Sequence, residues 1–338
     1  MTRFSITQLI LGISVFILIA GSAYFLFGNA SFFQITPNGH AITIARTGGF
    51  PTSLFWIAED NGYFRDEGLQ VSYLDYDAGQ PGLDALREGR ADITASGELP
   101  IVRSIMRGDK IFIVAELESD NGKNIIGRKD RGIRSAADFK GKRIGVTKGT
   151  VNEFQLISFL EAHGIAENQV TLVDVSFAKA AEELMSDRLD AVSARQGTIV
   201  QLEQQLADNG TVFSTEGIYT FRFLMVANQD FIKNQPDAIE KVLRALVRAE
   251  EFTRKQPEAS QRLISKYLQL EPSVIEDTWG RYRFSINLSQ PIFVTLEDEA
   301  RWLINRDQTL PREVPNFLEY IYIDALNKVK PGSVTIPR

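Results

Sequence analysis

Two stretches of the chain repeat the same alternation of apolar runs and polar turns. In the first, a short β-branched run at 41–45 precedes a loop with two glycines and a proline at 46–52. An apolar segment at 54–58 and a second apolar run at 69–74 follow, separated by polar turn residues. This order predicts a strand, a loop, a helix and a second strand, the start of a parallel βαβ unit. Because ligands of such sheets bind at the carboxyl ends of the strands, we expect the loop at 46–52 to contact a small molecule.

The second unit begins with a short apolar strand at 142–146 and continues through the loop 147–150 into an apolar helix at 151–160. The strand residues 169–174 (QVTLVD) then echo residues 70–75 (QVSYLD). Three residues also recur with the same spacing: Leu86, Arg90 and Asp92 in the first unit match Leu184, Arg188 and Asp190 in the second. The repeats predict two similarly wound α/β lobes, and a cleft between two lobes commonly binds a ligand.

Three segments carry a resemblance to a known family. They read TGGFPTSLFWIAEDNGYFRDEGLQV, LDALREGRADITASGELP and DFKGKRIGVTKGTVNEFQL. The chain from Ala41 onward resembles the solute-binding proteins of nitrate/sulfonate/taurine-type ABC importers, a superfamily that includes thiamine-pyrimidine-precursor binders. The resemblance implies an α/β, two-lobe type II periplasmic-binding-protein fold, in which two crossover strands join lobes that close on a solute.

We expect four segments along the chain: an N-terminal segment and spacer (1–38), a first part of lobe 1 (39–126), lobe 2 (127–222) and a helical second part of lobe 1 (223–338). The two crossovers are expected at 124–128 and 220–226. In the last segment, prolines begin three predicted helices, at 236–255, 257–268 and 272–279, and two more helices are expected at 297–305 and 317–328.

The N-terminal segment contains a run without charges, from Leu9 to Phe27, which is long enough for a hydrophobic helix that spans a bilayer. It predicts either an uncleaved inner-membrane anchor or a cleaved signal, since Gly28-Asn29-Ala30 has the small residues of a cleavage site. In both cases the body of the protein is expected on the periplasmic, extracytoplasmic side.

Composition narrows the chemistry. The net charge is −6 and the sequence contains no cysteine and only two histidines. An acidic chain without a basic stripe is not expected to bind nucleic acid. The missing cysteines exclude disulfides, thiolate chemistry and a lipidated N-terminal cysteine, and no histidine pair has metal-ligand spacing. We therefore predict no metal site and no cofactor. The cysteine-rich motif of the precursor synthases in the superfamily is also missing, which argues against that activity.

The candidate ligand-binding residues lie at predicted strand ends and helix starts that face the cleft. Free N–H groups at a helix start attract anions, an arginine can fork onto a sulfonate or carboxylate, and an aromatic side chain can form a wall. Arg222 could instead face water from a crossover strand. The candidates are Thr47, Gly48, Gly49, Phe50, Thr52, Ser96, Gly97, Glu98, Gly149, Thr150, Asn152, Arg195 and Arg222.

The pattern favours a binding protein without catalysis. It would be a monomer that captures a small solute by hinge closure and delivers it to an ABC permease and ATPase on separate chains. Two alternatives stay open at this point. One is an enzyme on the same fold that uses Glu98 as an acid or base, and the other is a membrane-tethered sensory module.

Charge predicts the kind of solute. Glu98 follows Asp92 at the same spacing as Gln196 follows Asp190, and Gln196 stands beside Arg195. Lobe 1 would then offer a negative group and lobe 2 a positive one. We therefore expect an organic zwitterion or polar organic anion, such as a taurine-like sulfonate, rather than an inorganic ion.

Overall fold

The structure is a computed structural model that describes residues 40–120 and 122–336. The predicted hydrophobic helix at 9–27, and with it the choice between anchor and cleaved signal, lies outside the described residues. Within the described ranges, no helix has both the length and the apolar character that a membrane crossing requires.

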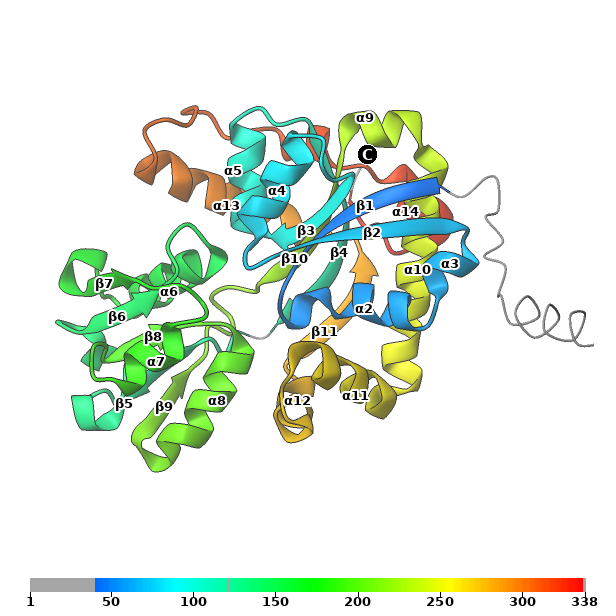
Figure 1. The fold of residues 1–338 in the computed structure, drawn as a ribbon. Coiled ribbons are helices and arrows are strands. Elements are labelled where there is room, and N and C mark those ends of the chain that lie inside the picture. Colours follow the sequence, from blue (N-terminus) through cyan, green and yellow to red (C-terminus); the bar gives the residue numbers. More distant parts are fainter. Residues whose placement is uncertain (1–39, 121, 337–338) are drawn as a thin grey trace, which may run out of the picture. The chain divides into compact units, whose positions relative to one another are not determined.

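The first of two sheets has six strands in the order β11-β4-β10-β3-β1-β2 (Figure 1). β1 pairs in parallel with β2 and β3, whereas β10 runs antiparallel to both β3 and β4, and β11 runs antiparallel to β4. The strands are β1 (His40–Thr47), β2 (Leu69–Tyr76), β3 (Ile93–Gly97), β4 (Ile111–Asp120), β10 (Arg222–Asn228) and β11 (Tyr282–Asn287).

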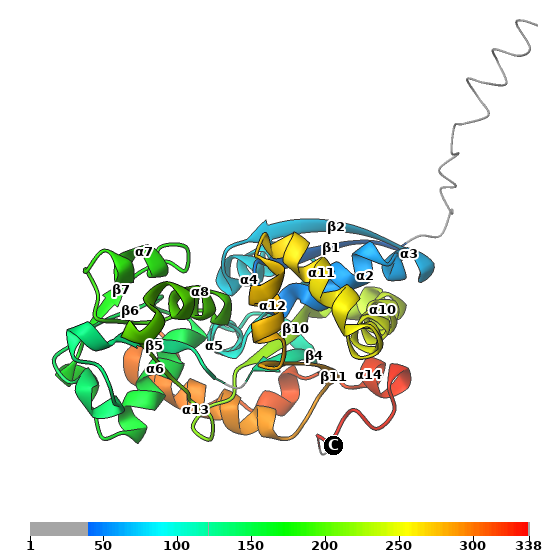
Figure 2. The same cartoon turned by 90° about the horizontal axis from the view of Figure 1, so that it is seen from below.

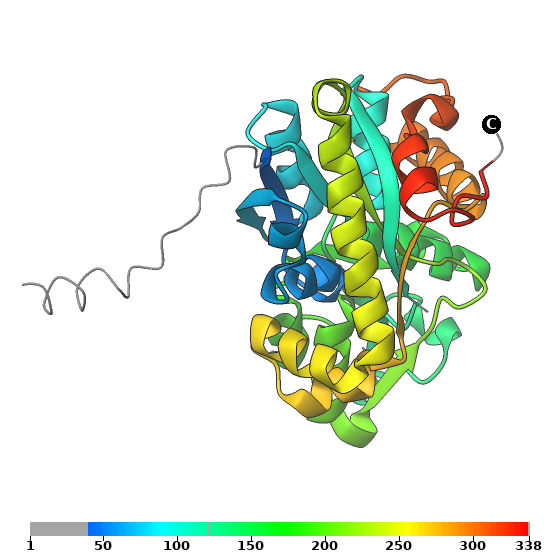
Figure 3. The same ribbon diagram turned by 90° about the vertical axis from the view of Figure 1, so that its right-hand side faces the viewer.

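Helices cover both faces of this sheet. The connections from β1 to β2 and from β2 to β3 run in opposite directions, so right-handed crossovers place their helices on opposite faces. The long helix α10 packs against α2, on one face, and α13 packs against α5 (Figure 3). The helices are α2 (Ser53–Asp60), α3 (Tyr63–Asp66), α4 (Gly79–Arg87), α5 (Glu98–Met106), α9 (Gln229–Asn234), α10 (Pro236–Lys255), α11 (Pro257–Leu268), α12 (Pro272–Trp279), α13 (Pro291–Arg306) and α14 (Asp324–Val329).

The second sheet has five strands in the order β7-β6-β8-β5-β9. Two separate apolar clusters flank it, one that includes side chains of α6 and another that includes side chains of α7 and α8. The elements are β5 (Ile125–Arg128), β6 (Arg143–Val146), β7 (Thr171–Asp174), β8 (Ala191–Ser193), β9 (Gly210–Phe213), α6 (Val151–Ala162), α7 (Ala180–Met185) and α8 (Gln196–Leu206).

The repeat inferred from the sequence is confirmed by the strand order. β2-β1-β3 in the first sheet corresponds to β7-β6-β8 in the second, with parallel pairing in both. The repeated aspartates have the same task. Asp92 accepts a hydrogen bond from the Thr43 N–H of β1 at 2.8 Å, and Asp190 accepts one from the Arg143 N–H of β6 at 2.8 Å. Each carboxylate thus ties the start of its strand to the neighbouring strand.

In the structure, the predicted crossover strands do not connect the two sheets. β5 pairs with β8 and β9 and is therefore a strand of the second sheet, while β10 belongs entirely to the first. The chain passes between the sheets in 122–124 and 214–221, which belong to no strand. The division into segments 39–126, 127–222 and 223–338 remains a proposal.

The C-terminal helices follow the prolines. α10, α11 and α12 have the predicted bounds, because proline at the first helical position presets φ and needs no N–H partner. Two predictions were wrong in extent. The helix expected at 297–305 already begins at Pro291, and the one expected at 317–328 splits into a 3-10 turn (Phe317–Tyr320) and α14.

Candidate functional site: a cavity between the two sheets

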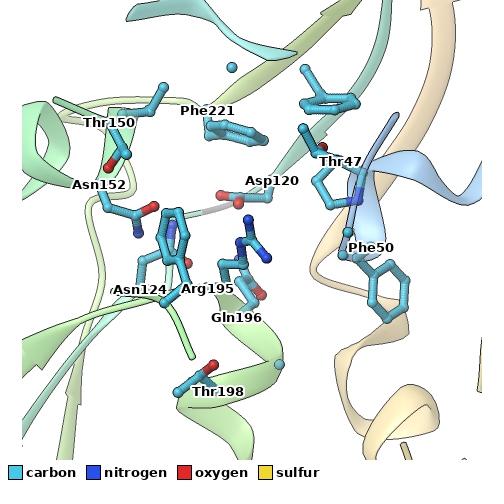
Figure 4. Close-up of a pocket in the computed structure, with 18 of the residues that line it drawn as sticks. Thr47, Phe50, Asp120, Asn124, Thr150, Asn152, Arg195, Gln196, Thr198 and Phe221 are labelled. Carbon is cyan, nitrogen blue, oxygen red and sulfur yellow. The ribbon is translucent and has the colours of Figure 1, made fainter. Parts of the chain in front are cut away.

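A cavity of about 300 Å³ lies between the two sheets (Figure 4). From the first sheet it is lined by the loop after β1 and by the end of β3, and from the second by the starts of α6 and α8. These are the carboxyl ends of strands at the points where the strand order reverses, which is where open α/β sheets hold their ligands.

The structure brings most of the predicted residues together in the lining of this cavity. They come from four separate segments of the chain, so only the tertiary structure joins them. The lining includes Thr47, Gly48, Gly49, Phe50, Ser96, Gly97, Thr150, Asn152 and Arg195.

Thr52 and Gly149, also predicted as binding residues, lie outside the lining. Thr52 is buried, and its hydroxyl donates to the Thr47 carbonyl, so that it holds the loop in shape from behind. At the start of α6, the Gly149 N–H donates to the Glu153 carboxylate at 2.7 Å. A carboxylate of the same helix therefore takes the N–H that we expected to attract an anionic solute.

Glu98 does not point into the cavity either. Its side chain is fully buried, and its carboxyl accepts the Arg222 N–H at 2.7 Å. Burial raises the pKa of Glu98 to about 8, against the opposing charge of Arg222. The acid that we assigned to lobe 1 of the cleft is thus part of the core behind it.

Further buried carboxyls surround Glu98. Glu299 accepts from the Tyr219 hydroxyl at 3.1 Å, and Glu118 has no hydrogen-bond partner among the described residues. Burial, and then the negative neighbours Asp120, Glu116 and Glu98, hold the pKa of Glu118 well above its usual range. Crowded carboxyls of this kind bind protons that the unfolded chain would release.

Arg222 belongs to the same core. Its Nε lies 3.3 Å from Glu116 Oε2, and its Nη1 donates to the Thr295 hydroxyl at 3.0 Å. It lines a different hollow, which it shares with Tyr219 and Asp298. The cavity between the sheets therefore has Arg195 as its guanidinium.

Arg195 reaches from the second lobe to the first. Its guanidinium donates to the Asp77 carbonyl oxygen and lies over the ring of Phe177, with Cζ 4.1 Å from the ring centroid. Burial lowers the pKa of Arg195, which nevertheless stays protonated at neutral pH. No carboxylate of the described residues forms an ion pair with it.

The residues that sequence reasoning missed are concentrated where the chain first leaves the first sheet. Asp120 ends β4 and Asn124 precedes β5, and both line the cavity. Asp120 is 8% exposed, and one of its oxygens accepts the Gly122 N–H at 2.7 Å. Burial raises its pKa to about 6, while the Gly122 N–H and the nearby amides of Asn124 and Gln196 act in the opposite direction. A carboxylate at the end of a strand that precedes a change of sheet was the available signal.

Several buried polar atoms on lining residues have no hydrogen-bond partner of satisfactory geometry among the described residues. These are the Ser96 hydroxyl, Asn124 Oδ1, and both amide atoms of Gln196. All three side chains are at least nine-tenths buried. Since buried polar groups are nearly always paired, their shared position on one cavity indicates a site that a polar ligand completes.

Aromatic and apolar side chains form the remaining walls. Phe50 stacks in parallel on Tyr282 with centroids 3.9 Å apart, and Phe177 and Phe221 line the cavity from other segments. The site thus combines apolar walls with a few polar groups, as small-molecule sites in proteins commonly do.

The lobes touch beside the cavity. A Cβ at Gly97 would lie 2.6 Å from Val151 Cγ2, so glycine permits the start of α6 to approach the end of β3. On another side α8 packs against α12 (Figure 2), and Arg281 lies 3.2 Å from Glu203. The two lobes therefore touch on two sides of the cavity.

Within the described ranges, no group of three or more histidine, aspartate or glutamate side chains could hold a metal ion.

The family model described as NMT1/THI5 like matches residues 52–260, more than half of the chain. The chain belongs to the NMT1/THI5-like family. The matched range includes the cavity-lining segments of the second lobe and many of the cavity-lining residues of the first lobe.

Curated relatives of this NMT1/THI5-like protein have different names. A putative binding protein of Brucella abortus is 25% identical over 236 residues, which are 67% of this chain and 70% of that protein. A putative aliphatic sulfonates-binding protein of Bacillus subtilis is 24% identical, over 65% of this chain and 68% of that protein. A 4-amino-5-hydroxymethyl-2-methylpyrimidine phosphate synthase of Saccharomyces cerevisiae is 22% identical, over 66% and 68%.

Solved structures establish the fold. The periplasmic aliphatic sulphonate binding protein SsuA from Escherichia coli has a TM-score of 0.73 at 18% identity, covering 84% of this chain and 98% of that chain. The alkanesulfonate-binding protein SsuA from Xanthomonas axonopodis pv. citri, bound to MOPS, has a TM-score of 0.71 at 18% identity, covering 85% and 99%. The NMT1/THI5-like protein therefore has the α/β periplasmic-binding-protein fold.

Proposed function

We propose that this protein is the exported solute-binding component of an ABC importer, and that it captures a small organic anion or zwitterion in the cavity between its lobes. The observation that carries the proposal is the cavity itself, which lies between the two sheets and is lined by buried polar atoms without partners. The names of the Brucella and Bacillus relatives and of the SsuA structures support a binding role.

The mechanism follows from the position of the site. Residues from both lobes would contact the solute, so the solute has its highest affinity for the closed arrangement and shifts the equilibrium toward it. A permease and an ATPase on separate chains would then accept the closed, loaded protein.

The name of the yeast relative favours an enzyme as the second candidate. In our sequence analysis that alternative relied on Glu98 as the acid or base. Glu98 is buried behind the cavity, so an enzyme would have to use other groups.

A thermal-shift screen of the full-length chain in mild detergent tests the proposal. The probes are alkyl and amino sulfonates, aromatic carboxylates, pyrimidines, nitrate and bicarbonate. A specific ligand at a hundred times its dissociation constant should stabilise the protein by about 2.7 kcal/mol. Mass spectrometry of the bound compound before and after incubation separates binding from turnover, and a chemically altered compound would favour the enzyme.

Closure can be measured on the same protein. The chain has no cysteine, so cysteines introduced at the exposed positions Glu88 and Ala162 can carry a pair of fluorescent labels, one on each lobe. The distance between the labels should shorten when a binding probe is added. An unchanged distance with a bound probe would argue against closure as the mechanism.

A further inference from the structure

Two groups of opposite charge line the cavity, and neither forms an ion pair with a described residue. Asp120 forms no ion pair with a lysine or arginine in the ranges 40–120 and 122–336, and Arg195 forms none with a carboxylate there. Asp120 and the side chains of Arg195 and Gln196 face the same space between the sheets (Figure 4). A charge removed from water without a partner is costly, so a solute that pairs with both groups would gain from both.

A chain of hydrogen bonds determines which atom of Asn124 remains available. The Thr215 hydroxyl donates to the Gly122 carbonyl at 3.2 Å and accepts from Gln155 Nε2 at 2.7 Å. Gln155 therefore presents its oxygen to Asn124, whose Nδ2 donates to it at 2.8 Å. Asn124 Oδ1 is left without a partner, and Asn124 is only 4% exposed.

The end of the cavity beside residues 120–124 thus presents acceptors. Asp120 contributes a carboxylate that a backbone N–H holds in place, and Asn124 contributes an amide oxygen. These acceptors can pair with N–H or O–H donors, and a carboxylate favours a donor that carries positive charge, such as a protonated amine. A bare oxyanion such as nitrate carries no hydrogen to donate to either group.

Arg195 has the opposite preference. One of its N–H groups is bound to the Asp77 carbonyl, and the others can donate to an acidic group of the solute. The same cavity has aromatic walls, which include Phe177, Phe221 and Tyr282. An organic body that joins a basic group to an acidic one would contact all three kinds of surface.

We propose that Asp120 and Asn124 form a subsite for a protonated amine of the solute, that Arg195 binds the acidic group of the same solute, and that the protein selects organic zwitterions over the corresponding acids without an amine. This inference rests on the proposed solute-binding function and names the class of solute and the residue that decides it. It replaces the predicted role of Glu98 with Asp120.

The test compares probes in matched pairs that differ by one amine. The pairs are taurine and ethanesulfonate, 3-aminopropanesulfonate and propanesulfonate, 4-(aminomethyl)benzenesulfonate and 4-methylbenzenesulfonate, and 4-(aminomethyl)benzoate and 4-methylbenzoate. Isothermal titration calorimetry of the full-length chain in detergent gives the affinity for each. We expect the amine to improve binding about tenfold or more in at least one pair.

The isosteric variant Asp120→Asn should bring the two members of that pair to nearly equal affinity. Glu118→Gln is the matched control, because Glu118 is a buried carboxyl on the same strand that does not line the cavity. It should keep the preference for the amine. Melting curves of both variants report whether they fold, and the preference of the unmodified chain is measured without any variant.

Each other outcome is decisive. If the acids without an amine bind as well as their partners, the inference is overturned while the solute-binding function stands. If the amine preference survives Asp120→Asn, the assignment of Asp120 is wrong. If no probe of any pair binds, the inference is overturned, and the wider thermal-shift screen decides the proposed function separately.

Discussion

The starts of α5 and α8 have the same backbone and place their side chains in different surroundings. Gly97 before α5 has φ −63° and ψ 163°, and Arg195 before α8 has φ −61° and ψ 147°. Glu98, the first residue of α5, is buried in the core of the first lobe, whereas Gln196, the first residue of α8, lines the cavity.

The neighbouring strand explains the difference. Gly97 pairs with Phe223, so Glu98 lies beside the Arg222 N–H and accepts from it. Ser193 pairs with Ile125, and the same register would place Gln196 beside Gly122. There, however, the N–H already donates to Asp120. Gly122 has φ +75°, a conformation that favours glycine, and this turn lets Asp120 take the bond.

Equivalent positions of a repeat thus diverge through one backbone N–H. Where it is free, the side chain turns to it and becomes structural. Where a carboxylate elsewhere in the chain already accepts the N–H, as Asp120 accepts that of Gly122, the side chain remains available to a ligand. Sequence spacing identified the pair correctly, but not which member faces the cavity.

The two helix starts should differ most strongly in how they affect the pH dependence of stability, because Glu98 ionises and Gln196 does not. The pKa of Glu98 is 4.5 in an ordinary setting and about 8 in the fold, so the folded state holds the proton that the unfolded state loses. The stability that the raised pKa of Glu98 provides is complete below pH 4.5, falls between pH 4.5 and about 8, and is level above that. Each such carboxyl contributes a slope of at most about 1.4 kcal/mol per pH unit.

Denaturant unfolding measured from pH 4.5 to 8 checks this expectation. Glu98→Gln should flatten the decline, and Glu161→Gln, an exposed substitution, should leave it unchanged. Stability that rises across this range in the unmodified chain, or a decline unaffected by Glu98→Gln, would contradict it.

Arg195→Ala tests whether the start of α8 contributes to solute binding. Loss of the guanidinium removes the positive group of the cavity, and we expect a loss of solute affinity of about 2–5 kcal/mol. Calorimetry with the tightest probe measures it. Arg222→Ala provides the comparison, since Arg222 lines another hollow and should affect stability more than affinity.

Glu98→Ala and Gln196→Ala should have opposite signatures. The first leaves the part-buried Arg222 N–H without its acceptor and should lower stability by about 1–3 kcal/mol with little change in solute affinity. The second removes an amide that has no partner in the described residues, so it should weaken solute binding and barely change stability. If both variants lose affinity equally, the two positions do not differ as we infer.

Gly97→Ala is expected to have the smallest effect. The new Cβ would lie 2.6 Å from Val151 Cγ2 and 3.0 Å from the Phe221 ring, so the lobes would have to move apart slightly. We expect about a tenfold loss of affinity, or about 1.4 kcal/mol, together with a longer distance between the labels on the two lobes. Gly280→Ala, where a Cβ meets open space, is the control and should bind normally.

Much of the architecture follows from the sequence alone. Apolar runs separated by glycine and polar turns determined the strands and helices of both lobes, because their periodicity reflects local backbone geometry. The repeated aspartates showed that the lobes are wound alike, and proline marked the starts of α10, α11 and α12. The sequence predicted that the loop after β1 and the start of α8 face the cavity, because parallel sheets bind ligands at the carboxyl ends of their strands.

Only the tertiary structure decided which charged groups face the ligand. Three predicted site residues lie outside the cavity lining because they pair with other groups. Glu98 and Arg222 pair with segments far away in the sequence, and Gly149 pairs with a carboxylate of the helix that follows it. Asp120 and Asn124 entered it because the chain changes sheets between them. The direction of a side chain depends on the hydrogen-bond partners that long-range strand pairing supplies, and spacing along the chain carries no information about those partners.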